Sequence, residues 1–274
     1  MRSQGADVTV LATEAPGHAT ELARRAAEAG ADLVLVASGD GVLNEAINGL
    51  VHTPVTLGVL PAGTANVLAS EFSLARSPAA VAQLIPQLVA RRISVGRLEA
   101  AGIPPRHFLL MAGVGLDAQI VASIDPELKK RLGKLAYWLG GFGQLGRRFP
   151  EFHVRVNGEV LRSSFALASR VRNYGGDLEI AKTVNLLEDD FELVCFEGED
   201  SFRYLKYLTG VLASLHDKME GVSIQRVREA RFEPREGQEI LVQVDGEPAG
   251  RLPARIELAP EALTLLMPPR LRTS

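Results

Sequence analysis

The chain has 274 residues, 30 of them basic and 33 acidic, for a formal net charge of −3, and this length suits one or two domains with a sizeable buried core. Hydrophobic residues make up 46% and charged residues 23%, which excludes a disordered, collagen-like or coiled-coil chain. The acidic balance argues against nucleic-acid binding, and a single cysteine excludes both a disulfide framework and a cysteine-rich zinc site.

The beginning of the chain lacks the pattern of a secretory signal, because residues 1–9 contain no apolar run of the required length. The longest apolar region, residues 132–145, is interrupted by Lys134 and four glycines. A membrane-spanning helix needs about 20 mostly apolar residues. We therefore expect a cytoplasmic protein without a transmembrane segment.

The first 95 residues alternate between strand and helix patterns. Short β-branched runs predict strands at 8–12, 33–37 and 55–60. Helices are expected at 21–29, with Thr20 as N-cap, at 42–50, at 65–72 and from Ser77-Pro78 toward Arg92, with a kink at Pro86. This order predicts a doubly wound α/β domain.

The pattern changes near residues 93–95 to strands joined by hairpin turns. Strands are expected at 108–112, 152–156, 165–169, 191–196, 222–226, 240–244, 255–258 and 263–267. Asn157-Gly158 and Asp245-Gly246 are typical hairpin dipeptides. Helical stretches at 126–148 and 202–218 interrupt the strands. The second part is thus predicted to be mostly antiparallel β structure.

Two glycine-containing turns follow neighbouring predicted strands and precede helices. They are Ser38-Gly39-Asp40-Gly41 and Pro61-Ala62-Gly63-Thr64. Glycines let the backbone approach a ligand closely, and a helix N-terminus attracts anions. A single turn of this kind is often only a connection, but two in succession favour a polyphosphate site. The embedded Asp40 favours a bridging Mg²⁺ ion or a catalytic base.

These turns and several later segments resemble motifs of the diacylglycerol/sphingosine lipid kinase family. Residues 38–49 (SGDGVLNEAING) resemble its GGDGT-x-NE-x-x-NG motif, and residues 61–69 resemble its P-x-GT-x-N-x-x-A motif. The later similarities are residues 108–118 (FLLMAGVGLDA), 132–139 (LGKLAYWL), 244–247 (VDGE) and 263–268 (LTLLMP). The resemblance covers nearly the whole chain.

This resemblance implies a nucleotide-binding α/β domain at residues 1–94 and a β-sandwich lipid-binding domain at 95–274, whose last residues return to the first domain. It implies transfer of the γ-phosphate of ATP to a lipid hydroxyl, most simply diacylglycerol, with Mg²⁺. The implied nucleotide contacts are Ser38, Gly39, Gly41, Asn44, Glu45, Gly63, Thr64 and Asn66. Asp40 and Asp117 would hold the hydrated metal, and Glu247 would be the general base. In the sphingosine kinase pattern the base would instead be Asp40.

Several positions depart from the family pattern. Ser38 replaces a glycine, Val42 a threonine, and Ser94 an aspartate. The family also opens with a strand ending in Asn-Pro and a Ser-Gly turn, whereas residues 8–12 resemble its second strand. These departures leave two alternatives open, a catalytically impaired nucleotide- or lipid-binding homologue and, less well matched, an NAD kinase.

Further predictions concern the binding partners and two other segments of the chain. The lipid substrate would be presented at a membrane surface, and a homodimer is left open. Residues 132–145, with Tyr137, Trp138 and Phe142, could line a lipid slot or form core, and the flanking Lys129, Lys130, Arg131, Arg147 and Arg148 could face anionic lipid or solvent. The acidic run at Asp189-Asp190 is interpreted as an exposed turn rather than a structural metal site, because Phe191 replaces the usual glycine.

Overall fold

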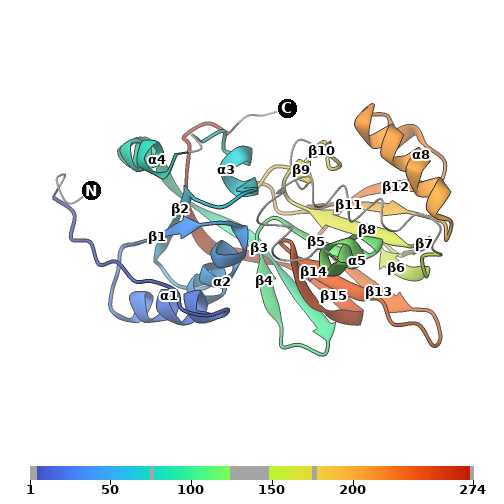
Figure 1. Cartoon of the computed structure of the whole chain (residues 1–274), viewed down its shortest axis with the longest axis horizontal. Helices are drawn as coiled ribbons and strands as arrows, with labels where there is room; N and C mark the ends of the chain where they lie inside the picture. The colour runs from blue at the N-terminus through green and yellow to red at the C-terminus, as the bar shows by residue number, and fades with distance from the viewer. Residues whose placement is uncertain (1–4, 75–76, 124–147, 175–177, 272–274) are drawn as a thin grey trace. The chain divides into compact units, whose positions relative to one another are not determined.

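The computed structural model describes residues 5–271 with the exception of 75–76, 124–147 and 175–177. The chain divides into two compact units (Figure 1). The first comprises residues 1–93 and 261–273, and the second residues 94–260. Two strands, β3 (Val89–Ala101) and β15 (Glu247–Met267), continue from one unit into the other. Among the described helices, none combines the length and apolar character needed to cross a bilayer.

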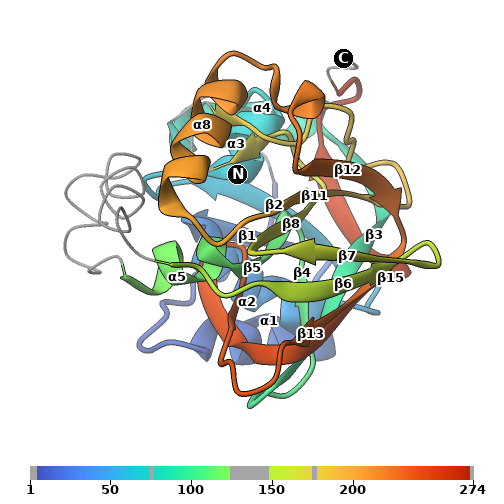
Figure 2. The same cartoon turned by 90° about the vertical axis from the view of Figure 1, so that its right-hand side faces the viewer.

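The first unit is an α/β layer structure. Its strands β1 (Leu33–Ser38) and β2 (Thr56–Pro61) are parallel, and the end of β15 pairs with β2 in the same direction through Thr264 and Thr56. Helices α1 (His18–Glu28) and α2 (Asp40–Leu50) lie on one face of these strands, with α3 (Val67–Glu71) and α4 (Pro78–Leu84) on the other (Figures 1 and 2). Helices on both faces are what a parallel sheet requires.

The second unit is built from antiparallel strands. A continuous hydrogen-bonded path runs β12-β11-β8-β5-β14-β15-β13-β6-β7. Its strands are β5 (Met111–Gly115), β6 (Phe152–Val156), β7 (Glu159–Ser163), β8 (Phe165–Ser169), β11 (Phe191–Phe196), β12 (Val222–Val227), β13 (Glu229–Pro234) and β14 (Leu241–Val244). The shorter β4 (Arg106–Phe108) pairs with β3, and β9 (Asn173–Tyr174) pairs with β10 (Leu178–Glu179). The helices are α5 (Leu116–Ser123) and α8 (Ser201–Leu212).

One face of this sheet forms a single hydrophobic core. Alternate residues of the strands point into it, as the period of two dictates, for example Ala112 and Val114, Ala166 and Ala168, and Val242 and Val244. The residues between them, including Gly113 and Gln243, therefore belong to the opposite face, which we call the outer face.

The predicted fold class is confirmed, an α/β unit followed by mostly antiparallel β structure, but several elements differ. Residues 8–12 form no strand, and Val10 and Leu11 are 79% and 55% exposed. A β-branched run forms a strand only where a neighbouring strand pairs with it. The helix from Pro78 ends at Leu84 and passes through a 3₁₀ turn, Ile85–Gln87, because Pro86 lacks an amide donor. Thr20 is not an N-cap: α1 begins at His18, and Gly17 precedes it.

Candidate functional site

The first unit brings the two glycine turns together. Parallel pairing of β1 and β2 places Ser38 opposite Pro61, and the Ala62 amide donates a 3.1 Å hydrogen bond to the Ser38 carbonyl. Gly39 directly precedes α2, and Gly63 lies a few residues before α3. Both turns therefore lie at the carboxyl edge of the same sheet, where α/β proteins bind ligands.

The two turns touch at their glycines. A Cβ atom added to Gly63 would lie 2.4 Å from the Gly39 Cα, which no side chain tolerates. Asn66, at φ 48°, holds the second turn, because its amide accepts from the Gly63 N–H at 2.9 Å and donates to the Gly63 carbonyl at 2.7 Å. Gly63 and Thr64 are exposed. At this contact the backbone of Gly63 is exposed and has no room for a side chain.

Asp40 links the first turn to the second helix. It is the first residue of α2, and its Oδ2 accepts a 3.1 Å hydrogen bond from the N–H of Val67, the first residue of α3. Asp40 is partly buried, as are Ser38 and Gly41. The carboxylate thus lies among the helix N-termini where an anionic ligand is favoured.

Asn44 and Glu45, two other expected nucleotide contacts, are both held within the first unit. Asn44 is fully buried in α2. The Glu45 carboxylate accepts from the backbone N–H of Gly17 at 2.8 Å and of Ala19 at 3.1 Å, at the N-terminus of α1. An acid at that position caps free amides and complements the helix dipole. Glu45 therefore connects α2 to α1, and a nucleotide contact by either residue stays a prediction.

In the second unit, Asp117 is a fully buried carboxylate on the outer face. It follows β5 directly, in the first turn of α5. A Cβ on Gly113 would fall 1.5 Å from its Oδ2, so the first glycine of the GVG segment makes room for the carboxylate, while Gly115 turns the chain at φ 77°. Tyr174 donates to Oδ1. Burial raises the pKa of Asp117 to about 6, although its two hydrogen bonds oppose that rise.

Gln243 connects Asp117 to the turn that carries Glu247. Its Nε2 donates to Asp117 Oδ2 at 2.6 Å, and its Oε1 accepts from the Gly246 N–H at 2.8 Å. Asp245 and Gly246 have positive φ, as in a type I′ turn, and Glu247 begins β15 opposite Val244. The two acids proposed from the second unit are therefore joined through one buried amide, which the sequence did not reveal.

Asp245 has a role that its turn position did not suggest. Its carboxylate accepts hydrogen bonds of 2.9–3.0 Å from the N–H groups of Leu109, Leu110 and Met111. The predicted strand at 108–112 is therefore divided, because these amides bond to a side chain instead of a strand. A carboxylate on three amides is a stable, charge-assisted arrangement.

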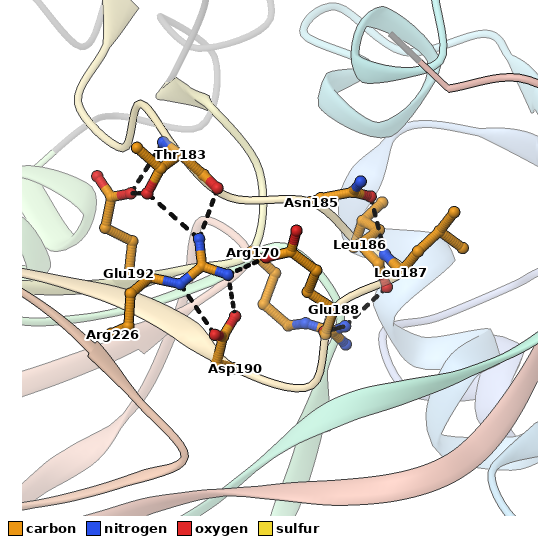
Figure 3. Close-up of polar contacts among 9 residues, drawn as sticks. All are labelled: Arg170, Thr183, Asn185, Leu186, Leu187, Glu188, Asp190, Glu192 and Arg226. Carbon is orange, nitrogen blue, oxygen red and sulfur yellow. Dashed lines mark hydrogen bonds and ion pairs between the residues drawn. The ribbon is translucent and has the colours of Figure 1, made fainter. Parts of the chain in front are cut away.

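The acidic turn before β11 is held by arginines (Figure 3). Asp190 accepts from Arg226 Nε at 2.9 Å, and Glu188 also contacts the Arg226 guanidinium. The fully buried Arg170 donates to the carbonyls of Leu186 at 2.8 Å and Glu188 at 2.9 Å. Burial lowers the pKa of Arg170 to about 10, and the charges of Asp189 and Asp190 oppose this.

Ser94 belongs to the same network. Its hydroxyl donates to Asp189, and its carbonyl accepts from Arg170. Within the described ranges, no three histidine, cysteine or acidic side chains are grouped as a metal site would require. The predicted lipid slot at 132–145 and the basic residues 129–131 and 147 lie outside the described residues.

Family comparisons match both units. The diacylglycerol kinase catalytic domain matches residues 1–98, and the YegS C-terminal NAD kinase beta sandwich-like domain matches residues 111–267. The chain is 28% identical over 273 residues to a diacylglycerol kinase of Mycobacterium tuberculosis, covering 98% of this chain and 87% of that protein. It is 31% identical over 283 residues to a probable YegS-like lipid kinase of Chromohalobacter salexigens, covering 98% and 86%.

Solved structures share the fold. A crystal structure of a candidate diacylglycerol kinase from Bacillus anthracis has a TM-score of 0.81 at 23% identity, covering 97% of this chain and 86% of that one. A further diacylglycerol kinase structure from the same organism has a TM-score of 0.69 at 19% identity, covering 97% and 87%.

Proposed function

Because the chain belongs to the diacylglycerol kinase and YegS-like lipid kinase family, we propose that it transfers the γ-phosphate of ATP to a lipid hydroxyl. Diacylglycerol or a related lipid is the proposed acceptor, and Mg²⁺ the proposed cofactor. The observation that carries this proposal is the close approach of Gly39 and Gly63, where Gly63 has no room for a side chain, beside the Asp40 carboxylate at the N-termini of α2 and α3. Such an arrangement suits a polyphosphate.

Gly39, Gly41, Gly63 and Thr64 are the proposed phosphate contacts. Phosphate oxygens accept hydrogen bonds from backbone amides and from hydroxyl groups, which these residues supply. Ser38, which stands where the family has a glycine, is compatible with this assignment. It is an extended strand residue paired with Pro61, so the position does not require a positive φ. Asn66 would keep the second turn in place through its two hydrogen bonds to Gly63. Asn44 and Glu45 would act by positioning α2.

Asp40 is the proposed direct ligand of Mg²⁺, since a partly exposed carboxylate beside phosphate-binding turns has the chemistry this ion prefers. The bound ion would neutralise charge that develops on the phosphates. Asp117 fits a direct ligand role less well, because Tyr174 and Gln243 occupy both of its oxygens. It would reach a hydrated ion only by exchanging one of these partners.

Glu247 is the proposed general base that accepts the proton of the lipid hydroxyl. It is partly exposed at the end of a turn, which suits contact with substrate, and Gln243 ties that turn to Asp117. Asp40 is the alternative base. A base in the right position contributes about 10²–10⁴-fold to the rate. If Glu247 is the base, its replacement should slow transfer by this factor, and if Asp40 is the base, it should not.

The test is incubation of the protein with γ-labelled ATP, Mg²⁺ and a total lipid extract, followed by extraction into organic solvent. We expect label in the lipid phase and none after Asp40→Ala, with folding intact. Label on added NAD instead would indicate a NAD kinase. Absence of label together with no calorimetric binding of Mg-ATP would indicate an impaired homologue.

A further inference from the structure

Helix α8 has an apolar face directed toward solvent. Eight large hydrophobic side chains are exposed among the described residues, and four of them lie in α8 or in the turn after it. They are Phe202 (68% exposed), Leu205 (42%), Leu212 (58%) and Leu215 (51%). Within the helix, positions 202, 205 and 212 fall on one side, together with the half-buried Leu208 and with Thr209. We call Phe202, Leu205, Leu208, Leu212 and Leu215 the α8 patch.

The fold does not need this patch, because α8 is attached by its other side. Tyr207 and Val211 are buried. The Tyr207 ring stacks on Phe196 with centroids 4.9 Å apart, and its hydroxyl donates to the Glu197 carbonyl at 2.9 Å. A contiguous exposed apolar surface on such a well-anchored helix indicates an interaction site.

The charges around the patch favour an anionic partner. Lys206 and Lys218 are exposed, and in the part of the chain that the structure describes neither forms an ion pair with a carboxylate. Of the neighbouring acids, Asp217 is neutralised by its ion pair with Lys182 at 2.6 Å, whereas Asp200, which accepts from the Phe202 N–H, keeps its charge. The partly buried Arg203, which lies over the Tyr207 ring, adds a third positive charge. Glu220 is the remaining exposed acid of the segment after α8.

The patch also lies on the side of the unit that carries Asp117. Tyr174, which donates to Asp117, contacts Phe165 with centroids 6.5 Å apart, and Phe165 stacks on Phe196 at 4.9 Å. Phe196 in turn stacks on Tyr207 of α8. This row of rings runs along the outer face of the sheet, so α8 and the Asp117 carboxylate share one face of the second unit.

We propose that the α8 patch is a membrane-docking surface that inserts Phe202, Leu205 and Leu212 among the headgroups of an anionic bilayer. An amphipathic helix with apolar and lysine side chains on its free side binds such an interface. The inference rests on the proposed lipid kinase function, because an enzyme that acts on a membrane lipid must meet the bilayer on the side that carries its site.

Co-sedimentation with vesicles of phosphatidylglycerol and phosphatidylcholine, without ATP, tests the surface. We expect the full chain to bind, and the double variant Leu205→Ser/Leu212→Ser to bind at least tenfold more weakly with an unchanged thermal midpoint. The matched control is Val160→Ser/Leu187→Ser, which removes two exposed apolar side chains elsewhere. Equal binding by both double variants, or no binding by the unaltered chain, would overturn the proposal.

Two further outcomes also decide against it. A lower thermal midpoint in the Leu205/Leu212 variant would mean that the face is covered within the chain. A dimer that this variant converts to a monomer would mean that the patch joins two copies. Phosphorylation of a water-soluble, short-chain diacylglycerol reports the proposed function separately, and we expect it to be unchanged in the variant.

A labelled thiol gives an independent readout. The single cysteine, Cys195, is buried, and burial raises the pKa of its thiol to about 12, so it is unreactive. The variant Leu212→Cys therefore carries one reactive thiol for an environment-sensitive dye. We expect its emission to shift to the blue when vesicles are added, with no shift for dye at Val160→Cys. No shift at position 212 would contradict insertion of α8.

Discussion

The side-chain amide of Gln243 donates a 2.6 Å hydrogen bond to Asp117 Oδ2, and both residues are buried. The same amide accepts from the Gly246 N–H, so one side chain fixes both the buried acid and the turn of the proposed base. An amide in this position can serve both neighbours only in one orientation, with its nitrogen toward Asp117. The geometry of the second unit's proposed site therefore depends on Gln243.

Replacement of Gln243 by leucine should separate the two acids. We expect transfer to fall about 10–100-fold and the free energy of unfolding to drop by about 1–3 kcal/mol, because a buried carboxylate loses a donor. The control is Gln225→Leu, whose side chain bonds to Asn157 and Glu159 at the surface. Steady-state kinetics and urea unfolding measure both effects, and full activity in Gln243→Leu would contradict the link.

Asp117 should make stability depend on pH. Burial raises the pKa of Asp117 from 3.8 to about 6, so the native chain holds this proton more tightly than the unfolded chain. The contribution is fully present below about pH 4 and is lost as pH rises through 6, a change of about 3 kcal/mol. Asp117→Asn removes it. Urea unfolding at pH 4.5 and 7.5 should show the unaltered chain losing stability relative to the variant, and a constant difference would refute the assignment.

Gly63→Ala should abolish transfer, because the new methyl group would meet the Gly39 backbone at 2.4 Å. We expect a loss of about 1–3 kcal/mol in unfolding free energy from overpacking. Gly237→Ala is the control: it has open space but φ 73°, and should lose about 1 kcal/mol with transfer retained. Calorimetry with Mg-ATP reports the site directly, and unimpaired binding by Gly63→Ala would remove the turn from the nucleotide site.

Replacement of Asp245 should lower stability, whereas replacement of Glu247 should lower the rate of transfer. Asp245→Ala leaves three buried amides without their acceptor, so we expect a loss of about 2–5 kcal/mol in stability. Glu247→Gln should leave stability within about 0.5 kcal/mol and lower transfer about 10²–10⁴-fold. Thermal unfolding and turnover, measured on both variants, check this division. Similar stability losses in the two would show that Glu247 is also structural.

The sequence predicted those features that depend on local patterns. The alternating run at 152–156 and the continuous run at 191–196 became β6 and β11 over the same residues, because packing and propensity agree there. The glycine turns were placed correctly between strand and helix, since glycine and helix start signals are local. The strand predicted at 8–12 was wrong, because a strand needs a neighbouring strand to pair with, and the residue types of the run do not provide one.

Long-range partners of polar side chains were not predictable in this way. Asp245 looked like an ordinary turn residue, yet its carboxylate bonds amides more than 130 positions earlier in the chain. The acidic turn is exposed at residues 187–189, as expected, but its partners were not predicted: Arg226 bonds to Asp190, and Arg170 bonds to the backbone carbonyl of Glu188. Such pairs depend on which strands become neighbours, and a hydrophobic pattern fixes a residue's face but not its cross-strand partner.

The most direct test of the central claim is phosphorylation of dioctanoylglycerol from γ-labelled ATP with Mg²⁺, by the unaltered chain and by Glu247→Gln. We predict labelled lipid from the unaltered chain and at least a hundredfold slower labelling by the variant, with equal unfolding midpoints. Label that appears at the same rate with both proteins would remove Glu247 as the base. No lipid label from a folded chain that binds Mg-ATP, across the lipid extract as well, would contradict the lipid kinase assignment itself.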